Sequence, residues 1–338
     1  MPAADGGDSV LDLTVTAPVF NEAESLPSLC RELHQVLAAL GRSYEILLVD
    51  DGSTDASWEV LQRQAALYPH IRLIRFRRNF GQTAAMSAGF REARGRVIVT
   101  LDADLQNPPS AIPRLLAKME EGYDVVSGWR RRRKDPFLTR RLPSILANAL
   151  ISRITGVALH DYGCSLKAYR REVVKNVHLY GEMHRFIPAL ASWVGGSIAE
   201  VEVDHASRCF GTSKYGLSRT LRVVLDLMTV KFLMHYSRGP IQMFGRIGLL
   251  FAVPGFLILL FVILGNLSYH LFGVTGIVTE LVKRPFWLFT PFMMILFGVQ
   301  FISIGLLAEI LIRTYHEAQN KPIYVIRETF EGTAPAGG

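Results

Sequence analysis

The sequence predicts an α/β domain with a mostly parallel β-sheet, followed by a C-terminal hairpin of two transmembrane helices. Three observations support this fold class. Short apolar segments alternate with helical patterns over residues 12–210, acidic clusters follow three of the apolar segments, and two long C-terminal segments contain no charged residue. Alternation of strands and helices is typical of a parallel sheet with helices on both faces.

Five apolar segments have the length and composition of strands, and four segments between them have helical spacing. The strands are expected at Leu13–Ala17, Glu45–Val49, Ile71–Phe76, Val97–Leu101 and Val125–Ser127. The helices are expected at Leu26–Leu40, Ser57–Tyr68, Gln82–Arg94 and Pro109–Glu121. Ligands of such sheets bind at the carboxyl ends of the strands, so we expect the functional site there.

Two C-terminal segments are long enough to cross a bilayer. Ile247–Leu264 and Pro285–Ala308 are free of charged residues. As helices they extend about 27 and 36 Å, compared with roughly 30 Å for the hydrocarbon core. The alternative is a pair of buried core helices. The preceding Leu217–Arg238 predicts an amphipathic helix, which lies either on the membrane surface or against the soluble domain.

The net charge of +7 is compatible with anionic partners such as nucleotides, lipid head groups or nucleic acid. An excess of Lys and Arg on the cytoplasmic side of a membrane protein explains it equally well. No nucleic-acid-binding motif is present, so we expect no nucleic-acid partner. Cys30, Cys164 and Cys209 are widely spaced and form neither a disulfide framework nor a zinc pattern.

Acidic clusters follow three of the expected strands. They are Asn21-Glu22, Asp50-Asp51 and Asp102-Ala103-Asp104. Two carboxylates separated by one residue in an extended stretch can reach the same ion, and their hard oxygen atoms suit Mg²⁺ or Mn²⁺ bridged to a diphosphate. One such pair is a weak signal, but three clusters after three strands are much more specific.

Four segments carry a resemblance to a known family. APVFNEAESL, LLVDDGSTD, RNFGQTAAMSAGF and LDADLQNPP resemble the family 2 glycosyltransferases of GT-A fold. Within this family, the chain resembles the polyprenyl-phosphate sugar transferases over about residues 12–326. The DYGC segment, the G-x-SKY loop and the paired apolar segments look closest to the aminoarabinose-type enzymes.

The resemblance implies transfer of one sugar, with inversion, from a nucleotide diphosphate sugar to a polyprenyl phosphate. A UDP-sugar and undecaprenyl phosphate are favoured, GDP-mannose remains an alternative donor, and the product would serve cell-envelope glycan or lipid A modification. The implied cofactor is Mg²⁺ or Mn²⁺. The implied location is the inner membrane, as a multi-pass protein with its catalytic domain in the cytoplasm. A homo-oligomer is left open.

Two other functions are considered. A processive membrane polysaccharide synthase would be expected to carry a Q-x-x-R-W motif and further spans, and the sequence has neither. A non-catalytic nucleotide-binding membrane anchor would not need Asp50, Asp102 and Asp104 together.

The resemblance also implies roles for donor-site residues, all of which follow the expected strands. The base and ribose would contact Pro18, Asn21, Glu22, Asp50 and Asp51. The nucleotide and sugar pocket would be shaped by Asn79, Gly81 and Gln82. The metal and diphosphate site would be lined by Asp102, Asp104 and Gln106, with Ala103 between the two carboxylates.

The resemblance implies roles for further residues that do not follow the expected strands so directly. A mobile loop would close on the diphosphate with Arg208, Ser213 and Lys214, and Arg130 would point toward the lipid phosphate. Many relatives carry an acidic residue directly before Phe-Arg in the segment that resembles GCSLK, where this chain has Cys164, Ser165 and Leu166.

The nearest carboxylate in that segment is Asp161, which joins Asp104, Arg208 and Lys214 as a candidate catalytic residue. Because a phosphate monoester is already anionic near pH 7, Asp161 would orient a substrate more than remove a proton. The alternative is that Asp161 caps the following helix.

These patterns divide the chain into five parts. They are a disordered N-terminus (1–11), a GT-A catalytic domain (12–216), a juxtamembrane amphipathic helix (217–240), two transmembrane helices (241–314) and a cytoplasmic C-terminal tail (315–338).

Overall fold

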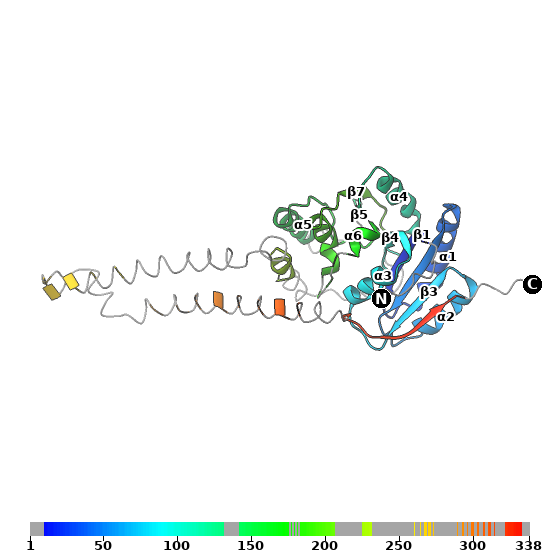
Figure 1. Cartoon of the computed structure of the whole chain (residues 1–338), viewed down its shortest axis with the longest axis horizontal. Coiled ribbons are helices and arrows are strands. Elements are labelled where there is room, and N and C mark those ends of the chain that lie inside the picture. The colour runs from blue at the N-terminus through cyan, green and yellow to red at the C-terminus, as the bar shows by residue number, and fades with distance from the viewer. Residues whose placement is uncertain are drawn as a thin grey trace, which may run out of the picture. The chain divides into compact units, whose positions relative to one another are not determined.

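The computed structural model describes residues 10–131, 142–175, 177, 179, 181, 183–206, 225–231 and 322–332, with single residues between 260 and 314. The chain divides into two compact units. One consists of Met1–Met234 with Pro322–Gly338, and the other is His235–Lys321. All the strands and helices described below belong to the first unit (Figure 1).

The described strands form one eight-stranded sheet, in the order β7-β5-β6-β4-β1-β2-β3-β8. The strands are β1 Leu11–Val19, β2 Tyr44–Asp50, β3 Ile71–Phe76, β4 Gly95–Thr100, β5 Val125–Trp129, β6 Lys167–Arg170, β7 Ile198–Glu202 and β8 Ile326–Glu331. β1 is parallel to both β4 and β2, β2 is parallel to β3, and β5 is parallel to β7. β6 and β8 run antiparallel to their partners. The five expected strands are confirmed, and β6, β7 and β8 were not expected.

The four expected helices are also confirmed. The described helices are α1 Leu26–Ala39, α2 Ser57–Leu67, α3 Gln82–Glu92, η1 Pro109–Ala111, α4 Ile112–Glu120, α5 Leu142–Thr155, α6 Arg171–Val174, η3 Met183–Phe186 and α7 Ile187–Trp193. The segment expected as one helix from residue 109 therefore begins as a 3₁₀ turn and continues as α4.

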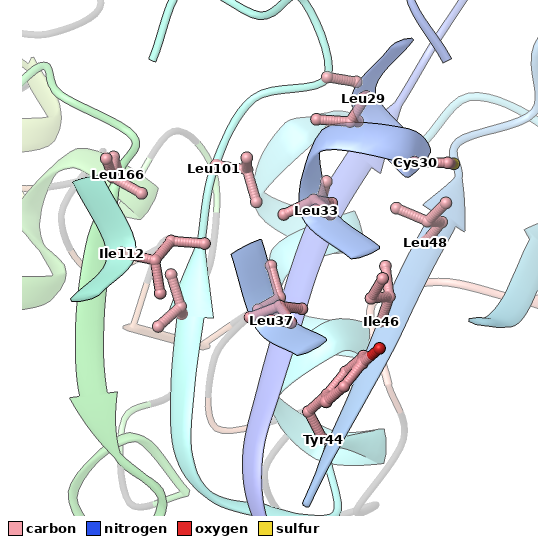
Figure 2. Packing of buried hydrophobic residues seen from close by; sticks show 14 of the residues in the cluster. Leu29, Cys30, Leu33, Leu37, Tyr44, Ile46, Leu48, Leu101, Ile112 and Leu166 are labelled. Atoms are coloured by element: carbon pink, nitrogen blue, oxygen red, sulfur yellow. The ribbon is translucent and has the colours of Figure 1, made fainter. Parts of the chain in front are cut away.

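Helix α1 covers one face of the sheet through leucines at helical spacing. Leu29, Leu33 and Leu37 are buried, and Figure 2 shows them over the β2 side chains Tyr44, Ile46 and Leu48. Cys30 packs in the same cluster, and burial raises the pKa of its thiol to about 12. A thiol held protonated in a core behaves as a small apolar side chain.

Helix α3 covers the opposite face and approaches the sheet closely at Gly89. Its inner surface is made of small residues, among them Ala84, Ala85, Ala88 and Gly89. A Cβ atom at Gly89 would collide with the Thr16 side chain on β1. Glycine here permits the close approach, which brings the N-terminus of α3 to the carboxyl edge of the sheet.

Strand β8 is the main departure from the sequence-based expectation for the C-terminal tail. It pairs antiparallel with β3, with Leu73 opposite Phe330. Just before it, Tyr324 is buried and stacks on Phe76, with ring centroids 4.9 Å apart. About 250 residues separate the two strands in the chain, so local sequence patterns do not reveal this pairing.

The residues expected to form the membrane-associated part lie largely outside the described residues. Among those that are described, no helix is long and apolar enough to cross a membrane. The described part of the expected amphipathic helix, residues 225–231, buries Leu227 and Val230 in a core cluster of the first unit, while Leu225 and Met228 are exposed. Residues 225–231 therefore pack one face against the domain, while the rest of the expected helix lies outside the described residues.

The aromatic stack that holds the C-terminal segment gives a testable prediction. Replacing Tyr324 by Ala removes a buried ring, so we expect a loss of about 3 kcal/mol in the free energy of unfolding. For a domain of this size, the melting temperature falls by roughly 6–12 °C. Val325→Ala is the matched control, because Val325 is 50% exposed. Equal melting temperatures for the two variants would contradict the proposed packing.

Candidate active site

The acidic clusters expected at strand ends do lie along one edge of the sheet. Val19 is paired with Asp50, and Thr16 with Thr100, so β1, β2 and β4 end close together. The loops after these three strands carry Asn21-Glu22, Asp51 and the 102–104 segment. The parallel register therefore gathers residues that are far apart in the chain.

The loop after β1 is tied to the loop after β2. Asn21 has a positive φ of 57°, and its Oδ1 accepts a hydrogen bond from the Thr54 backbone N–H at 2.8 Å. The Asn21 N–H donates to Ser53 Oγ at 3.0 Å, and the Glu22 N–H donates to Ser57 Oγ at 2.9 Å. Pro18 lies on β1 beside Val49. These contacts hold Asn21 and Glu22 in place next to β2.

Asp50, at the end of β2, is fully buried. Its Oδ1 accepts the Ser53 N–H at 3.2 Å, and its Oδ2 lies 3.5 Å from Arg75 Nε. No hydrogen-bond donor reaches Oδ2 among the described residues. Burial raises the pKa of this carboxyl above its ordinary value, and the Arg75 charge opposes the shift. Asp50 is thus a buried acceptor with one oxygen free of hydrogen bonds within the described structure.

Asp51 braces the loop that leads into α3. Its Oδ1 accepts the Phe80 N–H at 2.7 Å, and its Oδ2 accepts the Gly81 N–H at 2.9 Å. Burial raises the pKa of Asp51 to about 6 in spite of these bonds. Gly52 has a φ of 68°, and a Cβ there would collide with the Arg78 backbone. Both oxygens of Asp51 are therefore engaged in holding the 78–82 loop against β2.

This brace brings Gln82 to the end of β4. Gln82 is the first residue of α3, and its side-chain Nε2 donates to Asp102 Oδ1 at 2.8 Å. Gly81, just before it, has a φ of 96°, a conformation that favours glycine. Asn79 is exposed in the same loop. The sequence-predicted residues of two separate segments thus meet at Asp102.

The 102–107 segment forms a tight turn. Asp104 Oδ1 accepts the Gln106 N–H at 3.2 Å, Leu105 has a φ of 58°, and Ala103 is buried in the core. Burial is the main cause that raises the pKa of Asp102, and the charge of Asp104 adds to it. A bound cation would stabilise the ionised form of the Asp102 carboxylate.

Ser165 anchors this turn to β6, although sequence analysis gave it no role. Its Oγ accepts hydrogen bonds from the Asp102 N–H at 3.2 Å and from Asn107 Nδ2 at 2.9 Å. Its carbonyl oxygen accepts from Thr100 Oγ1 at 2.7 Å. The departure of this chain at residues 164–166 therefore places a serine beneath the acidic turn.

Asp161 forms a buried ion pair with Arg130. Arg130 Nε donates to Asp161 Oδ2 at 2.7 Å, and Arg130 Nη2 donates to Oδ1 at 3.0 Å. The side chains are 11% and 3% exposed. The pair raises the pKa of Arg130 although burial acts in the opposite direction. No helix follows Asp161 directly, and its Oδ1 accepts the Gly163 N–H in a turn, so Asp161 is not a helix cap.

A polar cleft opens beside Asp102. It is lined by Gln82, Met86, Asp102, Tyr162, Gly163, Cys164, Ser165, Lys167, Tyr169, His184 and Arg185. Sequence analysis predicted only Gln82 and Asp102 among these. His184 Nδ1 lies 2.8 Å from Thr83 Oγ1, and Lys167 is almost completely buried. Lys167 stands six residues after Asp161 in the chain, and this short separation is the sequence signal that points to it.

Three candidate residues are not tested by this geometry. Arg208, Ser213 and Lys214 lie outside the described residues.

Comparison with known proteins identifies the family to which the chain belongs. The sequence pattern described as glycosyl transferase family 2 matches residues 14–177. A dodecaprenyl-phosphate galacturonate synthase of Rhizobium johnstonii is 43% identical over 96% of this chain and 95% of its own. An undecaprenyl-phosphate 4-deoxy-4-formamido-L-arabinose transferase of Shewanella sediminis is 41% identical over 96% and 94%. The chain belongs to glycosyl transferase family 2.

Solved structures show the same fold at low sequence identity. A mannosyl-3-phosphoglycerate synthase from Rubrobacter xylanophilus has a TM-score of 0.53 and 17% identity, covering 68% of this chain and 75% of its own. A glucosyl-3-phosphoglycerate synthase from Mycobacterium tuberculosis, solved with Mn²⁺ and UDP-glucose, has a TM-score of 0.51 and 15% identity, covering 66% and 79%. The expected GT-A α/β fold with a mostly parallel sheet is thereby confirmed.

The Arg130–Asp161 pair gives the second prediction. Removing one partner of a buried ion pair leaves the other charge uncompensated, which costs about 3–5 kcal/mol. We therefore expect Arg130→Met and Asp161→Leu each to destabilise the protein strongly. The double variant should lose less unfolding free energy than the two single variants lose together, because no unpaired charge remains. Thermal unfolding of the three variants measures the coupling, and strict additivity would show that the two residues do not interact.

Proposed function

We propose that this protein transfers a single sugar from a nucleotide diphosphate sugar to a polyprenyl phosphate, giving a polyprenyl-phosphate sugar. The observation that carries the proposal is the identity of 41–43% with polyprenyl-phosphate sugar transferases over 96% of the chain. A processive synthase is not favoured, because these relatives match nearly end to end and are named for other reactions. The candidate site supports transfer chemistry over a purely structural role.

The nucleotide is proposed to bind over the ends of β1 and β2. The Asp50 oxygen without a hydrogen-bond donor is a suitable acceptor for a base or ribose hydroxyl group. Pro18, Asn21 and Glu22 lie beside it, which supports the same assignment. Asp51 contributes through the loop it holds, since both of its oxygens already accept backbone hydrogen bonds. Asn79, Gly81 and Gln82 are proposed to contact the nucleotide or sugar from that loop.

A divalent cation, Mg²⁺ or Mn²⁺, fits the turn after β4. The donor set consists of hard oxygens from Asp102, Asp104 and Gln106. Within the described residues, no group of three or more His, Cys, Asp or Glu side chains forms a metal cage. Two carboxylates with substrate phosphates are nonetheless a usual arrangement for Mg²⁺. The ion would supply positive charge to the departing nucleoside diphosphate.

The acceptor is proposed to enter near Asp161 and Arg130. Asp161 holds the Arg130 guanidinium in one orientation through two hydrogen bonds, so Asp161 acts as a positioning group for a cation near the site. This arrangement agrees with chemistry in which the anionic acceptor needs little help to lose a proton. Arg208, Ser213 and Lys214 are proposed, from the family resemblance alone, to add positive charge and a hydroxyl near the diphosphate.

The acceptor lipid requires a membrane location, for which we propose the inner membrane with a helical hairpin at 247–264 and 285–308. Pairing of β8 with β3 supports an even number of crossings. The chain leaves the first unit after residue 234 and re-enters it at 322, so both points lie on the same side of the membrane. The nucleotide-sugar site in this unit argues that this side is the cytoplasm.

Topology can be measured directly. A reporter fused after Gly338 is expected to report the cytoplasm, and a tag inserted after Thr275 is expected to be accessible from the outside. A tag inserted after Gly195, in a turn of the first unit, is the control and should stay inaccessible. An external C-terminus would contradict the hairpin.

Transfer itself is tested with membranes that contain the overproduced protein. They are incubated with undecaprenyl phosphate and radiolabelled UDP- or GDP-sugars, including UDP-galacturonate, and lipid-linked product is extracted and counted. We expect product with one nucleotide class and none without the lipid phosphate. Product that appears as a lengthening polymer would instead indicate a processive synthase.

Metal dependence belongs to the same assay. Excess EDTA should abolish transfer and added Mg²⁺ or Mn²⁺ should restore it. Asp104→Ala should reduce transfer by at least a hundredfold, corresponding to about 2.7 kcal/mol in the barrier. Glu121→Ala, an exposed acid after α4, is the matched control. Full activity of Asp104→Ala in EDTA would exclude the metal site at this turn.

A further inference from the structure

Lys167 is a buried cation that none of the assigned roles uses. It begins β6, and its side chain lines the cleft beside Asp102 and Gln82. The residue is only 3% exposed. Its ammonium group donates one hydrogen bond, to the Tyr162 carbonyl oxygen at 3.0 Å.

Three partly buried arginines of the same unit each have a carboxylate partner. Arg72 pairs with Glu45 at 2.7 Å, Arg75 lies 3.5 Å from Asp50, and Arg130 pairs with Asp161 at 2.7 Å. Among the described residues, no carboxylate lies within ion-pair distance of Lys167. A protein carbonyl satisfies one of the three N–H groups of an ammonium and none of its charge.

An ammonium buried in this way is costly unless an anion accompanies it. Burial accordingly lowers the pKa of Lys167 to about 8. The negative charges of Cys164 and Asp161 oppose this shift, and the positive charges of Arg130 and Arg185 add to it. Arg185 lines the same cleft. Two cationic side chains, Lys167 and Arg185, thus line the cleft, and a bound anion would compensate the buried ammonium group.

We propose that Lys167 is the central residue of an oxyanion subsite that binds a substrate group other than the donor's diphosphate. The inference rests on the proposed function, in which the diphosphate is bound at Asp102 and Asp104. The remaining oxyanions that reach the reacting sugar are the acceptor phosphate and a carboxylate on the sugar itself. Both present the same chemistry to an ammonium group, and experiment separates them.

Polar groups near Lys167 are already hydrogen-bonded to other protein groups, so we assign anion binding to Lys167. The Arg130 guanidinium is held by two hydrogen bonds to Asp161. His184 Nδ1 is engaged with Thr83 Oγ1 at 2.8 Å. Asp102 Oδ1 accepts a hydrogen bond from Gln82 Nε2, and Ser165 Oγ accepts one from the Asp102 N–H. Lys167 is the lining cation for which the described residues supply a carbonyl but no counter-ion.

The test compares Lys167→Gln with the wild-type full-length protein in detergent. Glutamine keeps a donor for the Tyr162 carbonyl and removes the charge. Lys167→Arg keeps the charge, and Lys175→Gln, at an exposed position after α6, is the control for loss of one positive charge. Four quantities are measured for each variant: the KM values for undecaprenyl phosphate, UDP-galacturonate and UDP-galactose, and the Kd for UDP.

The proposal expects at least a tenfold rise in one KM for Lys167→Gln, with the Kd for UDP changed less than twofold. A rise for undecaprenyl phosphate with every donor identifies the acceptor phosphate as the anion. A rise for UDP-galacturonate but not for UDP-galactose identifies a sugar carboxylate. Lys167→Arg should recover most of the loss, and Lys175→Gln should match the wild type.

Unchanged KM values in a folded Lys167→Gln variant would overturn the proposal. A rise in the Kd for UDP as large as the rise in KM would also overturn it, because Lys167 would then bind the diphosphate of the donor. If the glutamine variant does not fold, Lys167→Leu replaces it, because an apolar side chain avoids the cost of burying a charge. If the wild type forms no lipid-linked sugar, the proposed function fails. Direct binding of undecaprenyl phosphate and UDP-galacturonate to wild type and variant still tests the subsite.

Discussion

Parallel pairing of β4, β1, β2 and β3 is the constraint on which the site depends. Parallel strands point the same way, so the loops after β1, β2 and β4 must emerge at one edge. The register Val19–Asp50 fixes how far each strand extends before its loop begins. Small residues on α3, with Gly89 against Thr16, then allow a helix to approach this edge from the other face.

The polar residues at this edge do two kinds of work. Asp51 and Ser165 are fully engaged with protein groups and fix the loops, the first at Phe80 and Gly81 and the second at Asp102 and Asn107. Asp50 keeps one oxygen without a hydrogen-bond donor among the described residues, and burial raises the pKa of both Asp50 and Asp102, so a ligand that supplies a donor or positive charge would stabilise them. The bracing groups impose a fixed geometry on the second set before any substrate binds.

Some buried or partly buried cations of the domain have a carboxylate partner, whereas Lys167 has none among the described residues. We interpret the paired cations as structural and Lys167 as functional. Where a cation is matched by a carboxylate, as at Arg72–Glu45, the pair joins neighbouring strands and needs nothing else. Strand β8 contributes a similar pair between strands. Its Glu328 forms an ion pair with Arg75 on β3, and Arg75 also lies next to Asp50. The C-terminal segment is thereby connected electrostatically to the carboxyl end of β2, where we propose that the nucleotide binds.

The sequence alone determined the central strands, the four main helices and the acidic clusters, because hydrophobic period and strand-end carboxylates are local signals. It also indicated the family, through motifs such as LLVDDGSTD and LDADLQNPP. Only the tertiary structure decided that Asp51 is a brace, that Asp161 is paired with Arg130, that β8 completes the sheet edge and that Lys167 lines the cleft. Each of these depends on contacts between residues distant in the chain, and no local pattern records which partner a buried charge will find.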